Sequence, residues 1–186
     1  NYGSRLKYTS RAVTRIIAVS EAIRDVLVRY GVDPARVDVV YSGTDPGDFE
    51  GANGESVRRE FGVPPGARLV GKLANRYHNW KGHDTFVEAA RLVLRERDNV
   101  FFAAVGEHTN DERMRALVDE AGVAERFIAA GHRTDVPAVL NAFDISVNAS
   151  RAGEGLSGAV RESLAAGRPV VATDVGGNRE IIEDGV

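Results

Sequence analysis

The sequence predicts an α/β fold, a Rossmann-like parallel sheet with helices on both faces, and three observations support this. Short apolar runs typical of buried strands recur at Leu69–Leu73, Val100–Val105, Phe127–Ala130, Ile145–Ala149 and Val170–Thr173. Helical patterns of apolar residues separate these runs, and Gly122 is placed to end one such helix. Apolar strands that alternate with amphipathic helices indicate a parallel sheet covered on both faces, and such sheets bind ligands at the carboxyl ends of their strands.

The beginning of the chain adds a strand, a helix and a second strand. Residues 15–19 form a brief apolar run that predicts a buried strand, and Ser20 follows where a helix N-cap belongs. Apolar residues at helical spacing continue over residues 23–30, and Gly31 is placed to end the helix. Residues 37–41 predict the second strand.

A cluster of turn-forming residues then interrupts the pattern. Residues 43–54 are rich in Gly, Asp, Pro and Asn, which predicts an interdomain linker. We therefore expect residues 1–42 to be the remnant of an N-terminal domain, and residues 55–186 to be a ligand-binding domain truncated at its C-terminal end. The chain opens with Asn1 and has one methionine in total, so we expect it to be a piece of a longer protein.

Composition narrows the classes of function. A net charge of −3 without a run of Lys or Arg offers no field that would attract nucleic acid. No apolar stretch approaches the length of a membrane span, so we expect any membrane contact to be peripheral or to lie outside this piece. The absence of cysteine excludes disulfides and thiolate chemistry and fits a cytoplasmic protein. The four histidines lack metal-ligand spacing and no Asp-x-Asp motif is present, so we expect no metal site.

The glycine-rich stretch from Ser150 to Glu162 follows a predicted strand and opens a helix. Free backbone N–H groups and the helix dipole attract phosphate at such a position, and glycines at 153, 155 and 158 permit close approach of a ligand. Glu154 lies before the helix and Glu162 about two turns inside it, and a carboxylate suits the vicinal diol of a ribose. A flexible loop with two solvated glutamates is the alternative interpretation and stays open on this stretch alone.

A second cluster follows the first strand of the regular region. Arg76 and Lys81 bracket a loop at the sheet edge where ligands bind, and two cations there would neutralise a diphosphate. Ordinary surface charge is the alternative, and for Trp80 packing is favoured over a sugar platform. Arg133 follows another strand, where both a contact near a nucleotide base and a plain surface loop fit the sequence.

Taken together, these motifs resemble the family 4 retaining glycosyltransferases of GT-B fold. The resemblance covers nearly the whole chain in the right order. It rests on Arg76-x4-Lys81-Gly82, Glu154-x7-Glu162, residues 166–173, Gly176-Gly177-x-x-Glu180, and the pair of segments Ile17–Glu21 and Tyr41–Asp45, which resembles the crossover between the two domains of that family.

The resemblance implies roles residue by residue. Arg76 and Lys81 match the pair that holds the donor diphosphate and stabilises the leaving nucleotide. Glu162 matches the carboxylate that binds the ribose hydroxyls, and Glu154 matches the carboxylate beside the donor sugar. The phosphate-binding helix start is matched by the amides of Leu156, Ser157 and Gly158.

The same resemblance implies transfer of a sugar from a nucleotide-diphosphate sugar, with retention at the anomeric carbon and without metal or cofactor. The acceptor is left open among saccharides, lipids and small molecules, because the acceptor domain is represented only by its last strand and helix. We expect a cytoplasmic enzyme, with peripheral membrane contact at the inner face made through that domain, and we expect this piece to be inactive alone. Leu156-Ser157-Gly158 departs from the usual residues of the family, which leaves the sugar open.

Three alternatives remain. Gly153-x-Gly155-x-x-Gly158 also satisfies the dinucleotide fingerprint of an NAD-dependent oxidoreductase, with Asp174 as its acidic residue. Asp174 comes about four residues earlier than the usual spacing of roughly 20, and several strand–helix units precede the fingerprint instead of following it. A sugar-nucleotide epimerase or phosphorylase of the same fold, and a nucleotide-binding module without chemistry, are the other two.

Overall fold

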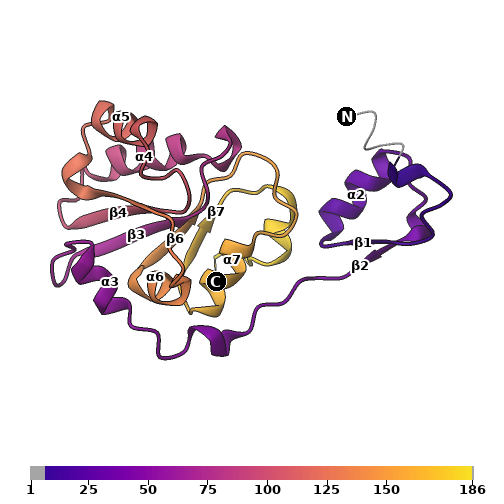
Figure 1. Cartoon of the computed structure of the whole chain (residues 1–186), viewed down its shortest axis with the longest axis horizontal. Helices are drawn as coiled ribbons and strands as arrows, with labels where there is room; N and C mark the ends of the chain where they lie inside the picture. The colour runs from indigo at the N-terminus through magenta and orange to yellow at the C-terminus, as the bar shows by residue number, and fades with distance from the viewer. Residues whose placement is uncertain (1–6, 186) are drawn as a thin grey trace. The chain divides into compact units, whose positions relative to one another are not determined.

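The computed structural model describes residues 7–185, which fall into two compact units (Figure 1). The first unit comprises Asn1–Gly43, Ala152–Ser157 and Asp174–Val186, and the second comprises Thr44–Arg151 and Gly158–Thr173. Segments from the N-terminal and the C-terminal parts of residues 7–185 therefore contribute to the first unit, whereas the second is built from the middle of the chain.

The second unit contains a five-stranded sheet in which all strands are parallel, as predicted. Its strands are β3 (Arg68–Leu73), β4 (Val100–Val105), β5 (Phe127–Gly131), β6 (Ile145–Asn148) and β7 (Val170–Ala172). They lie in the order β5-β4-β3-β6-β7. The chain moves outward in one direction from β3 and then returns to start β6 on the other side of β3. β3 and β6 thus form the point where strand order reverses, which is where open α/β sheets bind ligands.

Helices cover both faces of this sheet (Figure 1). They are α3 (Gly54–Glu60), α4 (His83–Val93), α5 (Glu112–Glu120), α6 (Val136–Ala142) and α7 (Gly158–Ala165), with short 3-10 turns η2 (Pro46–Phe49), η3 (Asn79–Lys81) and η4 (Ala124–Arg126). Alternate residues of β4 enter two separate cores, since side chains alternate across a strand. Ala103 packs with Leu140 and Phe143 under α3 and α6, whereas Phe102 packs with Phe86 under α4 and α5.

The segment predicted as a linker is partly built into the second unit. Phe49 of η2 is buried in the core, and its carbonyl accepts a hydrogen bond of 2.8 Å from Asn141 Nδ2. Gly54 begins α3 so close to α6 that a Cβ there would lie 2.4 Å from the carbonyl carbon of Asn141. Residues 44–54 therefore pack against this unit. The division into domains at residues 1–42, 43–54 and 55–186 stays a prediction.

The first unit is small. Strands β1 (Ile16–Ala18) and β2 (Val37–Val39) pair in parallel, with α2 (Glu21–Arg29) and the turn η1 (Pro34–Arg36) between them. Ser20 caps α2 by accepting a hydrogen bond from the Ile23 amide, and Gly31 follows the helix at φ 91°, as expected for a residue placed to end it.

Glu180, at the end of η5 (Gly176–Glu180), ties the C-terminal segment to α2. Its carboxylate accepts hydrogen bonds from the amides of Glu21 (2.8 Å) and Ala22 (2.9 Å), and the Tyr41 hydroxyl donates a third bond of 2.9 Å. Burial alone would raise the pKa of Glu180, but these hydrogen bonds lower it below its ordinary value. The motif Gly176-Gly177-x-x-Glu180 therefore supplies a carboxylate that adds to the Ser20 cap by accepting from two more amides at the start of α2.

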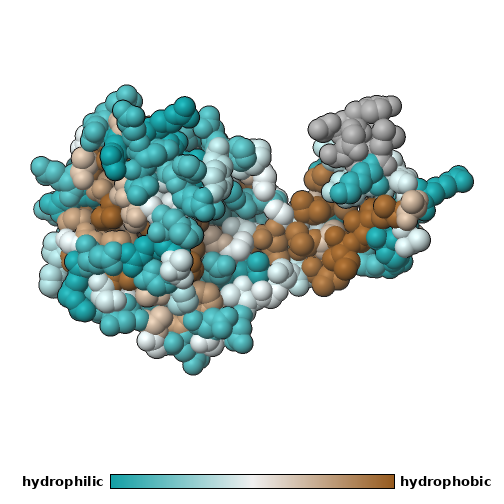
Figure 2. Space-filling view, viewed as in Figure 1, coloured by the Kyte–Doolittle hydropathy of each residue, from teal (hydrophilic) through white to brown (hydrophobic). Residues whose placement is uncertain are grey.

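Apolar side chains also gather on the outside of this unit (Figure 2). Ile17 is 69% exposed, and Val40 and Tyr41 are each about half exposed. None of the helices in residues 7–185 has both the length and the apolar character needed to cross a membrane.

Candidate functional site

Two loops of the second unit meet where the strand order reverses. The loop after β3 runs from Ala74 to Gly82, and the loop after β6 begins at Ala149. The Arg151 amide donates a hydrogen bond of 2.6 Å to the Trp80 carbonyl. Gly82 has φ 65°, and a Cβ on it would lie 1.9 Å from the Ala149 carbonyl oxygen, so only glycine fits there. The loop that carries the predicted cations is thus fixed against the loop that leads toward α7.

Arg76 is held by two acceptors beyond the neighbouring strand β4. Its Nη2 lies 2.6 Å from Asp111 Oδ1, and its Nε donates to the His108 carbonyl at 3.1 Å. The side chain is only 17% exposed. An arginine has five N–H donors, so the guanidinium keeps others for a ligand while its orientation is set. Such a pre-oriented cation suits the binding of a diphosphate.

Asp111, which holds the Arg76 side chain in place, is not among the site residues expected from the sequence. Its Oδ1 also accepts from the Met114 amide at 2.9 Å, which makes it the N-cap of α5. The hydrogen bond from Arg76 is the main reason that the pKa of Asp111 is lowered. An Asp before a helical pattern signals a cap, but no feature of the sequence links a cap to an arginine 35 positions earlier.

Lys81 ends the turn η3, directly before Gly82 and the first turn of α4. Its side chain is half-buried. His83 opens α4, is 4% exposed, and hydrogen bonds through Nε2 to the Ala74 carbonyl at 3.1 Å. This bond joins the two ends of the loop that contains Arg76 and Lys81. Burial, reinforced by the charge of Lys72, lowers the pKa of His83 to about 4, so the ring is neutral at pH 7 and donates from Nε2.

Glu162 lies in α7 with its side chain half-buried. Its Oε1 is 3.7 Å from the position that a Cβ on Gly158 would take, so the carboxylate lies over the first turn of the helix. Helical side chains lean toward the N-terminus, which accounts for this direction. Across residues 7–185, no side chain or amide pairs with this carboxylate, so its acceptor capacity is available to a ligand.

The rest of the glycine-rich stretch belongs to the first unit. Glu154 and Ser157 are buried, at 8% and 4% exposure, and Leu156 is half-buried. The Gly155 carbonyl accepts from Ser20 Oγ at 2.8 Å and from the Gly177 amide at 3.0 Å. This part of the stretch is therefore a packed loop within the first unit, and the alternative of a flexible loop is wrong for it.

The three glycines of the glycine-rich stretch differ in what the structure requires of them. Gly153 has φ 77°, a conformation that other residues rarely adopt. A Cβ on Gly155 would lie 3.0 Å from Val19 Cγ2, so this glycine makes room for a side chain of the protein. A Cβ on Gly158 would lie 3.7 Å from Glu162 Oε1 and 3.9 Å from Arg161 Nη2, which is ordinary contact with two side chains, so a small side chain would fit at this position.

Arg133 lies after β5, two strands away from the reversal point. Its Nε and Nη2 bind the two oxygens of Asp135 at 2.8 and 2.7 Å, its Nη1 pairs with Glu60, and the guanidinium stacks on Phe61. Hydrogen bonds from these two carboxylates raise the pKa of Arg133. The predicted contact with a nucleotide base would require Arg133 to give up part of this network.

Comparison with known proteins identifies the chain. Residues 67–186 match the family described as glycosyl transferases group 1, and residues 2–48 match the description glycosyltransferase family 4. The chain belongs to the glycosyl transferases group 1 family. In this family the chain is similar to 2-deoxystreptamine N-acetyl-D-glucosaminyltransferase of Streptomyces fradiae, with 32% identity over 95% of the chain and 43% of the relative. It is also similar to D-inositol 3-phosphate glycosyltransferase of Mycobacterium tuberculosis, with 29% identity over 92% of the chain and 36% of the relative.

Solved structures agree with this family and with the GT-B fold. The chain superposes on Anabaena HepE in complex with UDP-glucose with a TM-score of 0.82 and 25% identity, covering 93% of this chain and 48% of HepE. A glycosyltransferase from Rickettsia africae gives a TM-score of 0.86 at 23% identity, covering 99% of the chain and 51% of that protein. The chain thus spans about half the length of these structures and less than half of the curated relatives. None of them is an NAD-dependent oxidoreductase, so the dinucleotide interpretation is not favoured.

Proposed function

We propose that this chain contains the donor-binding part of a glycosyltransferase that transfers a sugar from a nucleotide-diphosphate sugar, with retention of the anomeric configuration. The observation that carries the proposal is the fixed loop after β3, which holds Arg76 and Lys81 at the reversal point of the sheet. Family membership supports a transferase, and the UDP-glucose complex of HepE supports a nucleotide-sugar donor.

In the proposed mechanism, Arg76 and Lys81 bind the diphosphate and stabilise the negative charge that develops as the nucleotide leaves. The helix start at Gly158 adds N–H donors and the positive end of the α7 dipole. Glu162 accepts the two ribose hydroxyls, and the family resemblance assigns the donor sugar to Glu154. Fixed cations perform the charge neutralisation that a metal ion performs in other transferases, so the proposal needs no metal.

The acceptor is a saccharide, a lipid or a small molecule, bound by the N-terminal domain to which residues 1–42 are assigned. The two curated relatives act, by their names, on 2-deoxystreptamine and on D-inositol 3-phosphate. Small polyols are therefore the first acceptors to test. The proposed location is the cytoplasm, with peripheral contact at the inner face of the membrane through the same domain.

Nucleotide binding tests the donor part of the proposal on the chain itself. Thermal unfolding is followed with UDP, GDP, ADP, their common sugar conjugates and NAD. A nucleotide present at 100 times its dissociation constant stabilises the folded state by about 2.7 kcal/mol, which corresponds to a rise in Tm of several degrees. We expect such a rise with one nucleoside diphosphate and its loss in Arg76→Ala. A response to NAD alone would refute the proposal.

Retention requires turnover, and is tested in a full-length enzyme that carries this sequence. The anomeric proton of the product is followed by NMR from the first turnovers, before mutarotation can mix the anomers. The proposal expects the donor and the first-formed product to share their configuration. An inverted product would overturn the retaining mechanism while leaving the donor site untouched.

A further inference from the structure

A cavity of about 510 Å³ lies at the opposite edge of the sheet of the second unit, where strands begin. Arg68 is the first residue of β3, Asp144 directly precedes β6, and Arg168 lies two residues before β7. Arg58 and Arg59 reach the cavity from α3. We call this cavity the arginine groove. It is separate from the proposed donor site, which lies at the carboxyl ends of β3 and β6.

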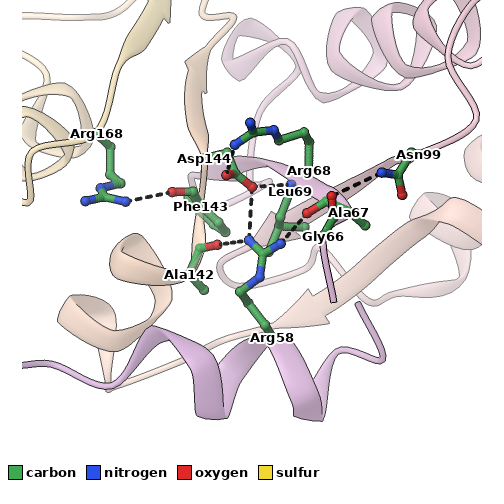
Figure 3. Close-up of polar contacts among 10 residues, drawn as sticks. All are labelled: Arg58, Gly66, Ala67, Arg68, Leu69, Asn99, Ala142, Phe143, Asp144 and Arg168. Atoms are coloured by element: carbon green, nitrogen blue, oxygen red, sulfur yellow. Dashed lines mark hydrogen bonds and ion pairs between the residues drawn. The ribbon is translucent and has the colours of Figure 1, made fainter. Parts of the chain in front are cut away.

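The inner wall of the arginine groove is fixed by Asp144 (Figure 3). Its carboxylate accepts from Arg58 Nη1 at 3.0 Å, from Arg68 Nη1 at 2.9 Å and from the Leu69 amide at 2.7 Å. Arg58 also donates to the carbonyls of Ala142 and Ala67, so three of its N–H donors are used within the protein, and its side chain is only 15% exposed. Arg58 and Asp144 therefore form the framework of the groove and not its binding surface.

Three other guanidinium groups keep unused donors. Arg68 makes one bond, to Asp144, and its side chain is 74% exposed. Arg168 donates to the carbonyls of Ala166 and Phe143, and these two bonds leave three of its N–H groups. Arg59 is exposed, and within residues 7–185 no group accepts a hydrogen bond from its side chain.

The charge of the groove is positive. Four arginines line it, and the acidic residues of its wall are Asp144 and Glu55, so two positive charges remain in excess. Guanidinium groups bind phosphate in a planar, bidentate manner and retain their charge when partly buried. A volume of about 510 Å³ lies in the range of small-molecule sites, roughly 300–1,000 Å³, and exceeds what a single inorganic ion fills.

We propose that the arginine groove is a second ligand site, which binds a soluble phosphorylated small molecule through Arg59, Arg68 and Arg168. In this proposal Arg68, at the start of β3, and Arg168, before β7, bind the phosphates, and the exposed Arg59 adds a third guanidinium. This site is independent of the proposed donor site, because it shares no residue with the loop of Arg76 and Lys81.

Inorganic pyrophosphate is the probe, and the backbone amides of the chain are the reporters in a two-dimensional NMR titration at constant ionic strength. The titration uses a variant with Arg76→Ala and Lys81→Ala, so that binding at the proposed donor site does not interfere. We expect saturable shifts at Gly66, Ala67 and Leu69, on the groove wall. In the same background, Arg59→Ala and Arg68→Ala should each raise the Kd about tenfold, the effect of losing one charge-assisted hydrogen bond.

Arg113→Ala is the matched control, because Arg113 is an exposed arginine of α5 that makes no side-chain bond among the described residues. It removes the same charge and should leave the Kd unchanged. Absence of saturation, or an equal effect of Arg113→Ala and Arg59→Ala, would reduce the groove to ordinary surface charge and refute the proposal. Binding to vesicles of phosphatidylglycerol without any binding of pyrophosphate would also overturn it, in favour of a membrane surface.

Discussion

Replacement of Glu162 by alanine is the sharpest test of the donor site. The carboxylate is half-buried at the start of α7 and has no partner within residues 7–185, so its loss should change the free energy of unfolding by less than about 0.5 kcal/mol. If it accepts both ribose hydroxyls, two hydrogen bonds to a charged group are lost. At about 1.5 kcal/mol each, the lower limit suited to a half-exposed group, nucleotide binding weakens by about 3 kcal/mol, or more than 100-fold.

Isothermal titration calorimetry measures this loss, with the nucleoside diphosphate that gives the thermal shift. The 2′-deoxy form of the same nucleotide isolates one of the two bonds. The unmodified chain should bind it about tenfold more weakly than the parent nucleotide, because one bond of about 1.5 kcal/mol is absent. Glu162→Ala should bind both forms equally, because the partner of the 2′-hydroxyl has been removed. Glu120→Ala, which removes an exposed carboxylate from α5, is the control.

Two results would contradict this reasoning. If Glu162→Ala binds the nucleotide as tightly as the unmodified chain, the carboxylate does not contact the ribose. If the variant binds weakly but still distinguishes the ribose from the 2′-deoxyribose form, the loss comes from a disturbed helix start and not from the diol.

Three further predictions concern stability, each measured by urea unfolding. Asp144→Asn should lower the free energy of unfolding by about 2 kcal/mol at pH 7, because Arg58 loses its charged partner. The pKa of Asp144 is lowered in the folded protein, so the stabilisation by its carboxylate is present above the ordinary carboxyl pKa and is lost as the pH falls through the folded pKa. The stabilities of the variant and the unmodified chain should therefore converge in acid. Glu180→Ala should cost about 1 kcal/mol, the usual effect of losing a helix cap, whereas Glu180→Gln should restore part of it, and equal effects would exclude capping. Folding lowers the pKa of His83 from 6.5 to about 4, so between these values the unfolded chain binds more protons than the folded one, and the free energy of unfolding should fall by about 2 kcal/mol from pH 7 to pH 5. His83→Gln, whose side-chain amide can also donate toward the Ala74 carbonyl, should not show this loss. If the variant keeps the same pH dependence, another group is responsible for it.

The sheet could be predicted from the sequence because its strands are buried on both faces. β4 is apolar throughout, and its predicted limits Val100–Val105 are those of the structure. The strands at the sides were less well defined, since β7 is partly exposed and ends one residue earlier than predicted. The helix α3 is not predicted from the sequence, because its first residue, Gly54, belongs to a run of turn-forming residues. That glycine serves close packing against α6, which depends on contacts distant in sequence.

The candidate site could also be predicted only in part, because some of its contacts join residues that are distant in the sequence. Arg76 and Lys81 could be selected because charged residues that follow a buried strand lie at the binding edge of a parallel sheet. The partner that orients Arg76 could not, because Asp111 comes from the loop after the next strand and is brought near only by the register of β3 and β4. For Arg133, the position after a strand does not predict the two carboxylates that pair with it, those of Asp135 and Glu60.

The glycine-rich stretch shows how a motif can serve packing and binding at once. Gly155 and Gly177 approach each other through a backbone hydrogen bond of 3.0 Å. A Cβ on Gly177 would lie 2.4 Å from the Gly155 carbonyl oxygen and clash with it, and a Cβ on Gly155 would make a tight contact of 3.0 Å with Val19 Cγ2. A ligand therefore does not account for them, because the protein itself occupies the space beside them. Gly158 differs, since a Cβ there would make only ordinary contacts, with the Glu162 carboxylate at 3.7 Å and the Arg161 guanidinium at 3.9 Å. A motif that spans the stretch thus combines glycines that the packing of the fold favours with one glycine that no protein neighbour requires. The two kinds can be separated only when the neighbours of each glycine are known.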